Sequence, residues 1–196
     1  MANTLAPFGF MEAYRLSGAP TFQQSRRRIA AGNATVIYKN DPVVQLASGY
    51  ITQATAGTTQ IAGIFVGCEY VSVSQKKLIV SPYWPGTDAN GDVTAYIIDD
   101  PMAVFRVQTN GSGALPATLT ALGNNANFAI GTGSTNTGNS GAMIDISTIA
   151  TTSTLPFRFV DLVLDPPGSN GADITTAFNW VYVAFNWQDY KSTTGI

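Results

Sequence analysis

The sequence predicts an all-β protein, because of its composition and the spacing of its apolar runs. Only 11% of its 196 residues are charged, and Glu and Lys, which usually fill helical surfaces, number two and four. Ser, Thr and Asn supply a quarter of the chain beside 19 Gly and 10 Pro, and these residues favour strands and turns. Short apolar runs with a turn about every 8–12 residues favour a small antiparallel β-barrel or sandwich core.

Residues 1–32 are expected to form an extended N-terminal arm, and residues 33–196 the barrel or sandwich domain. The arm carries the aromatic run Pro7-Phe8-Gly9-Phe10 and then Tyr14, interrupted by glycine and proline. Such a segment cannot fold alone, and its aromatic side chains would promote aggregation unless they found a groove elsewhere. Near its end lies Arg26-Arg27-Arg28, which holds half of the chain's arginines.

The first half of the domain reads as a series of short strands. Turn-forming residues separate them, notably Asn40-Asp41-Pro42 and Asp88-Ala89-Asn90-Gly91-Asp92, where Asn-Gly suits a tight hairpin turn. The strands on either side of Asp99-Asp100-Pro101 are expected to pair as a hairpin. Strands are predicted at residues 35–39, 43–46, 50–52, 61–68, 70–74, 78–80, 93–98 and 102–107.

Residues 110–153 form a polar insertion with a single charge, Asp145, and seven glycines. Its part from 131 to 141 has no apolar side chain, which predicts a long polar surface loop. Because residues 180–185 are apolar on both faces, the last strand is expected at a sheet centre or a subunit interface. Strands are predicted near residues 128–130, 143–146, 155–164 and 178–185.

Several function classes are excluded by composition. The chain has no histidine, which removes catalytic triads, histidine acid–base chemistry and nearly all zinc sites. A net charge of −2 argues against a nucleic-acid partner, which would select a basic excess. The single Cys68 cannot form an internal disulfide, and its apolar strand suits a small buried side chain. No signal peptide or membrane-spanning run is visible, so we expect cytosolic synthesis and no membrane partner.

Three motifs that could form a binding or catalytic site have simpler structural explanations. Residues 133–140 have the spacing of a phosphate-binding loop, but Asn139 stands where the lysine is needed. Asp88, Asn90, Asp92 and Asp99 have calcium-loop spacing, but a hairpin turn explains the first three and the required glycine is misplaced. A carboxylate pair for glycoside hydrolysis could come from four acids, but all of them occupy strand ends or turns, where Asp is common, namely Asp99, Asp100, Asp161 and Asp165. We therefore expect no enzyme activity, cofactor or metal.

Residues 41–86 carry a resemblance to a known family. The segments in order are Asp41-Pro42-Val43-Val44, Gly49-Tyr50-Ile51, Ala56-Gly57, Ile61-Ala62-Gly63-Ile64-Phe65-Val66-Gly67 and Ser81-Pro82-Tyr83-Trp84-Pro85-Gly86. This series resembles the small β-barrel core of the capsid decoration (cement) proteins of tailed bacteriophages. The opening residues 1–10 also look like the start of phage virion proteins. The resemblance implies a structural protein that binds the outer surface of an assembled capsid and clamps neighbouring subunits.

The expected partners are the phage major capsid protein and further copies of the chain, as a homotrimer in preference to a homodimer. The expected location is the outer capsid surface of the virion. Phe8, Phe10 and Tyr14 are candidate apolar anchors in the arm. The candidate partners for capsid carboxylates, which arginine grips with its planar fork, are Arg15, Arg26, Arg27 and Arg28.

Two other functions fit the sequence. One is a different virion component, such as a tail or minor head protein, which would be present in few copies. The other is a carbohydrate-binding sandwich that uses exposed aromatic platforms, for which the candidates are Tyr83, Trp84, Trp180 and Trp187.

Overall fold

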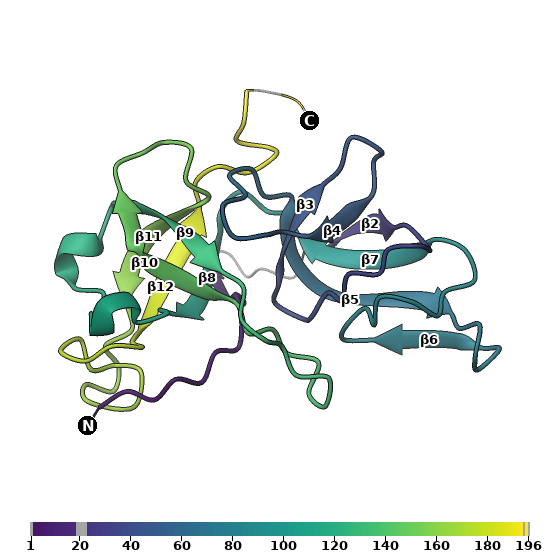
Figure 1. Ribbon diagram of the computed structural model, residues 1–196. Coiled ribbons are helices and arrows are strands. Elements are labelled where there is room, and N and C mark those ends of the chain that lie inside the picture. Colours follow the sequence, from purple (N-terminus) through teal and green to yellow (C-terminus); the bar gives the residue numbers. More distant parts are fainter. Residues whose placement is uncertain (1, 19–22, 194, 196) are drawn as a thin grey trace.

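The structure is a computed structural model that describes residues 2–18, 23–193 and 195. It confirms the all-β prediction: two antiparallel sheets form a sandwich-like core, and the described strands do not close into a barrel (Figure 1). The first sheet has the order β1 (Met11–Arg15), β8 (Ala103–Gln108), β12 (Trp180–Phe185), β11 (Phe157–Leu162), β9 (Asn125–Ala129) and β10 (Met143–Ala150). The second has the order β2 (Ser25–Ile29), β7 (Val93–Ile98), β5 (Gly63–Val71), β3 (Pro42–Gln45) and β4 (Ile51–Gln53), while β6 (Leu78–Ser81) pairs with β5. Two short 3-10 turns, η1 (Ser112–Ala114) and η2 (Leu119–Ala121), precede β9.

The predicted hairpin around Asp99–Pro101 is wrong. β7 pairs with β2 and β5, whereas β8 pairs with β1 and β12, so the two strands belong to different sheets. The residues between them carry the chain from the second sheet to the first. Local turn chemistry is the same in both cases, which is why the sequence could not distinguish a hairpin from a crossover.

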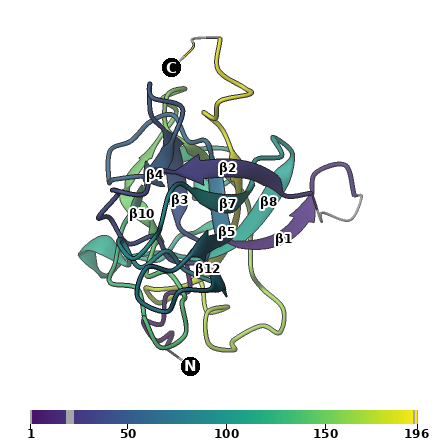
Figure 2. The ribbon, with the colours of Figure 1, turned by 90° about the vertical axis from the view of Figure 1, so that its right-hand side faces the viewer.

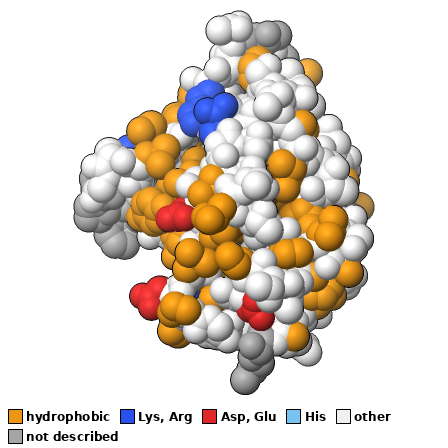
Figure 3. Space-filling model, turned by 90° about the vertical axis from the view of Figure 1, so that its left-hand side faces the viewer, with side chains coloured by type: hydrophobic (Ala, Val, Ile, Leu, Met, Phe, Trp, Pro, Cys, Tyr) orange, Lys and Arg blue, Asp and Glu red, His pale blue; other side chains and the backbone are white. Residues whose placement is uncertain are grey.

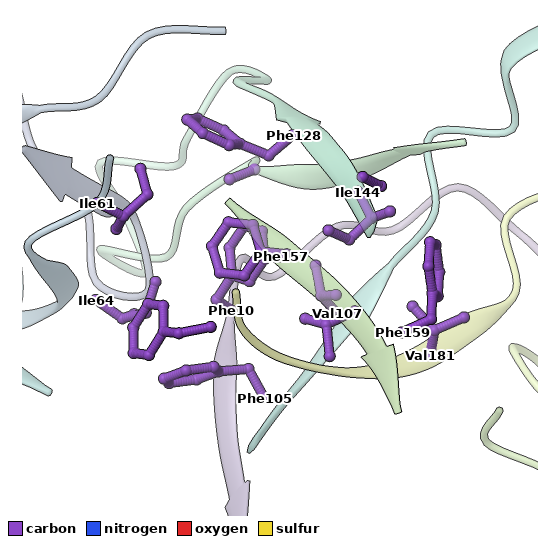
Figure 4. Packing of buried hydrophobic residues seen from close by; sticks show 14 of the residues in the cluster. Phe10, Ile61, Ile64, Phe105, Val107, Phe128, Ile144, Phe157, Phe159 and Val181 are labelled. Carbon is purple, nitrogen blue, oxygen red and sulfur yellow. The ribbon is translucent and has the colours of Figure 1, made fainter. Parts of the chain in front are cut away.

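A phenylalanine cluster lies where the two sheets meet (Figure 4). The Phe10 and Phe157 rings stack with centroids 4.3 Å apart, and Phe105 meets Phe185 edge-on at 5.0 Å. Ile64, from the start of β5, reaches the same cluster from the second sheet. Each such fully buried side chain contributes about 1.5–3 kcal/mol relative to its exposed state. The cluster therefore joins the sheets into one folded unit.

The N-terminal segment is built into this unit. Residues 2–10 follow an extended path without helix or strand, as expected, but β1 and β2 are edge strands of the two different sheets. The Asn3 side-chain amide donates to the carbonyls of Asp173 and Ala177, at 2.7 and 3.1 Å, which fixes the start of the chain to a distant loop. An arm that stands apart from the domain is therefore not what the described residues form.

The glycine-rich part of the polar insertion also packs against the chain. The Lys39 amide donates to the Gly138 carbonyl at 2.8 Å, and the Gly133 backbone lies against the Tyr38 ring. The Ser140 hydroxyl donates to the Asp41 carboxylate at 2.5 Å. Burial raises the pKa of Asp41, although this hydrogen bond acts in the opposite direction. Thr132, residues 134–137 and Asn139 of the predicted surface loop are exposed, whereas its other residues are buried or half-buried. The loop connects β9 to β10 and contacts the segment before β3 through Lys39.

Candidate protein-interaction surface

The arginine run lies on β2, an edge strand that Figure 2 shows in front of the second sheet. Successive side chains on a strand point to opposite faces. Arg26 and Arg28 are accordingly exposed on the outer face, while Arg27 turns toward the chain. In the described part of the chain, neither outward arginine forms an ion pair, so both remain available to an acidic partner.

Arg26 and Arg28 continue into a row of polar residues on β7. Arg26 lies opposite Tyr96 and Arg28 opposite Thr94, and the Arg26 guanidinium is 5.8 Å from the centre of the Tyr96 ring. A hydrogen bond to Glu69 of β5 raises the pKa of the Tyr96 hydroxyl. We call Arg26, Arg28, Thr94 and Tyr96 the basic strip.

The same face of the sheet ends in apolar residues. Val80 of β6 lies opposite Glu69, and Leu78 lies opposite Val71 at the end of β5. The exposed fractions of Val71, Leu78 and Val80 are 45%, 62% and 76%. We call these three residues the apolar strip. Sequence reasoning missed it, although Lys76 and Lys77 directly before a short apolar run are a recognised mark of an edge strand.

The other two candidate arginines are paired within the chain. The Arg27 guanidinium lies 2.8 Å from the Asp99 carboxylate, and that of Arg15 lies 2.5 Å from the Asp100 carboxylate. Both acids are buried, at 4% and 8% exposure, in the crossover between the sheets. Arg15 and Arg27 were expected to bind capsid carboxylates, whereas in this structure each is paired with a carboxylate of its own chain. Each ties an N-terminal strand to the crossover.

The three candidate aromatic anchors have different surroundings. Phe10 is fully buried in the chain's own core, so it is not a surface anchor. Phe8 packs edge-on against Trp180 at 5.7 Å and lies under the Arg106 guanidinium at 5.4 Å. Tyr14 alone is exposed, at 39%, and it meets the Tyr182 ring at 5.4 Å on the outer face of the first sheet. Partial burial, together with the charge of Asp161, raises the pKa of Tyr14.

The side of the molecule that lies at the left in Figure 1 has few charged residues. Figure 3 shows groups of hydrophobic side chains there among uncharged polar ones, with few Lys, Arg, Asp or Glu. The exposed apolar side chains of η2 and the loop before it, Leu119 and Leu115, are each 62% exposed. This agrees with the low charge of the whole chain.

The structure does not bring together the acids whose spacing matches a calcium-binding loop. Asp88 accepts hydrogen bonds from Ser72 and Ser74, Asp92 accepts one from Tyr50, and Asp99 is held by Arg27. Among the described residues, no group of three or more His, Cys, Asp or Glu side chains could hold a metal ion.

The aromatic residues considered for carbohydrate binding have different surroundings, and Trp187 is half-buried. Trp84 is fully buried and donates its indole N–H to the Asn33 carbonyl at 3.0 Å. Trp180 is covered by Arg106 at 4.7 Å, and Tyr83 stacks on Tyr38 at 5.8 Å. Trp84 in particular could not meet a sugar without unfolding of the second sheet.

Comparison with known proteins adds no relative. No family model, curated protein or solved structure matches the chain. Within residues 2–18, 23–193 and 195, no helix is long and apolar enough to cross a membrane.

Proposed function

We propose that the chain is a structural virion protein that binds the outer surface of a phage capsid and stabilises neighbouring major capsid subunits. The observation that supports this most is the basic strip, which places Arg26 and Arg28 on the outer face of a sheet edge. Side chains two residues apart on one strand lie about 6–7 Å from each other, a spacing that suits two acidic groups on a protein surface.

The chemistry of the strip favours protein carboxylates as its target. Arginine binds carboxylates with two parallel hydrogen bonds and keeps its charge at every physiological pH. The backbone of β2 is already ordered by its pairing with β7, so binding costs rotamer freedom of the two arginine side chains but no ordering of their backbone. Each contact is worth little by itself, but repetition over a symmetric shell adds avidity.

The low charge of the remaining surface supports the same function. Copies of the chain and of a capsid protein can lie side by side with little like-charge repulsion when few residues are charged. The resemblance of residues 41–86 to decoration proteins supports it independently of the surface.

The test is binding of the full chain to expanded capsids of the phage that encodes it, measured by co-sedimentation. The variant Arg26→Glu with Arg28→Glu reverses both charges of the basic strip, and we expect at least a tenfold loss of affinity. The matched control, Lys39→Glu with Arg158→Glu, makes the same change in net charge at two exposed residues away from β2 and β6, and should bind as the wild type does. Equal binding by both variants would refute the assignment of the strip.

A further inference from the structure

The open edge of β6 has features that point to a partner strand. β6 is the outermost strand at the lower right of Figure 1. Among the described strands it pairs with β5 along one edge, and no strand pairs with its other edge. Val80 is the most exposed large hydrophobic side chain in the described chain, and Leu78 is among the next. Natural proteins usually protect a sheet edge with charges or proline, and Lys76, Lys77 and Pro82 flank β6. Between these flanks, Leu78 and Val80 still expose apolar side chains along the strand.

The hydrogen-bond pattern identifies which backbone groups of β6 are unused. The Ser72 amide donates to the Lys77 carbonyl at 2.9 Å, which marks residues 72 and 77 as a hydrogen-bonded pair. Hydrogen-bonded pairs recur at every second residue of an antiparallel ladder. Ile79 and Ser81 therefore direct their backbone groups toward β5. The N–H and C=O groups of Leu78 and Val80 point outward along the free edge.

This pattern is complementary to itself. If two copies of β6 meet antiparallel with Ile79 on a two-fold axis, Leu78 of each copy lies opposite Val80 of the other. Both positions then form a hydrogen-bonded pair, giving four backbone hydrogen bonds, and the exposed Leu and Val side chains pack across the axis. A register shifted toward Pro82 would lose a donor, because proline has no N–H.

Charge also fits a second copy. In this antiparallel register, Lys77 of one copy lies opposite the neutral Ser81 of the other, whereas a parallel arrangement would place like charges side by side. The edge offers two exposed apolar side chains per copy, Leu78 and Val80, so the interface is a small one, below the range of about 1,200–2,000 Å² that stable specific interfaces bury.

We propose that the chain forms a two-fold symmetric dimer by antiparallel pairing of β6 with β6 of a second copy. The second sheets of the two copies then form one continuous sheet, with a basic strip at each far end. The dimer rests on the edge of β6 alone and does not depend on capsid binding. Because the interface is small, we expect a dissociation constant on the order of 10 µM.

The first test is the mass of the purified full chain by analytical ultracentrifugation over a range of concentrations. The wild type should pass from one chain of 20.7 kDa to two as concentration rises. Leu78→Lys should raise the dissociation constant at least tenfold. Leu119→Lys is the matched control, because Leu119 is equally exposed, at 62%, but lies on the other sheet's side. A wild type that stays monomeric at high concentration, or forms a trimer, would overturn the proposal.

The second test addresses the register. Val80→Pro removes an N–H that only the partner strand uses, so the dimer should be lost while the thermal unfolding of the monomer persists. Ile79→Cys places two thiols across the axis at a non-hydrogen-bonded pair, where Cα atoms lie close enough for a disulfide. Mild oxidation should link this variant into dimers and leave Leu119→Cys unlinked. Equal linking of both, or none of Ile79→Cys under dimer-forming conditions, would contradict the register.

Discussion

Gly9 shows how a single residue connects the N-terminal segment to the core. Its φ angle is +74°, and a Cβ atom there would lie 2.6 Å from the Asn40 carbonyl oxygen and 2.7 Å from the Ser140 side chain. Only glycine accepts both the left-handed backbone and the close approach. The same residue directs Phe10 into the phenylalanine cluster.

Gly9→Ala should therefore lower the free energy of unfolding by about 3 kcal/mol, measured by urea denaturation. Gly57→Ala is the control, since Gly57 also has a positive φ angle, +93°, but open space around its Cα. Its cost should be limited to the backbone strain of about 1 kcal/mol. Equal losses for the two variants would mean that the contact with Asn40 and Ser140 is unimportant.

Cys68 illustrates a residue whose burial controls its chemistry. The side chain is 1% exposed, and burial raises the pKa of its thiol to about 12. The thiolate is the reactive form, so at pH 8 the native protein should not react with a thiol reagent over hours, whereas the unfolded chain reacts at once. Rapid reaction of the native protein, followed by absorbance, would show that the strand opens readily.

At the scale of elements, two ion pairs with buried carboxylates and partly exposed guanidinium groups hold the crossover between the sheets. Arg27→Met leaves Asp99 charged and without its guanidinium, which should cost about 3 kcal/mol of unfolding free energy. Arg26→Met, one residue away but on the exposed face, should cost about 0.5 kcal/mol or less. Thermal or urea unfolding of the two variants distinguishes the roles of adjacent arginines. Similar losses in both would contradict the alternation of β2.

The N-terminal strands give a second prediction at this scale. A chain that begins at residue 33 lacks Phe10, β1 and β2, and so loses a core side chain and one edge from each sheet. We expect it to lose cooperative unfolding and near-ultraviolet circular dichroism. A truncated chain that still unfolds cooperatively would contradict this expectation and support the prediction that residues 1–32 form a separable arm.

Most strands after residue 40 were predictable, because strand-forming runs and Gly, Pro and Asn turns are local signals. The run predicted at residues 35–39 forms only isolated bridges, the runs at 61–68 and 70–74 contribute to one strand, β5, and β1 and β2 were not predicted. The final apolar strand at residues 178–185 is β12, and it lies at the centre of its sheet, as its two apolar faces indicated. Strand partners were not predictable in the same way. Whether the strands around Asp99 and Asp100 form a hairpin or a crossover depends on which distant strands they pair with, and no local pattern gives those partners.

The candidate surface was predictable in part. The arginine run was identified, but its placement in an arm hid the alternation that separates Arg26 and Arg28 from Arg27. The apolar strip was missed, because whether Leu78 and Val80 face the core or solvent depends on how β6 pairs with β5.

At the scale of the whole molecule, the second sheet carries both proposed interfaces, the basic strip and the edge of β6. The basic strip would hold the chain on a shell of acidic sites, and the β6 edge would join copies in pairs. Few charged residues elsewhere allow both surfaces to be approached closely by neighbours.

A cryo-electron-microscopy reconstruction of the virion tests the central claim most directly. We expect many copies of the chain on the outer surface of the head, with β2 facing the major capsid protein. A chain found in a few copies at the tail, or missing from the particle, would contradict the proposed function.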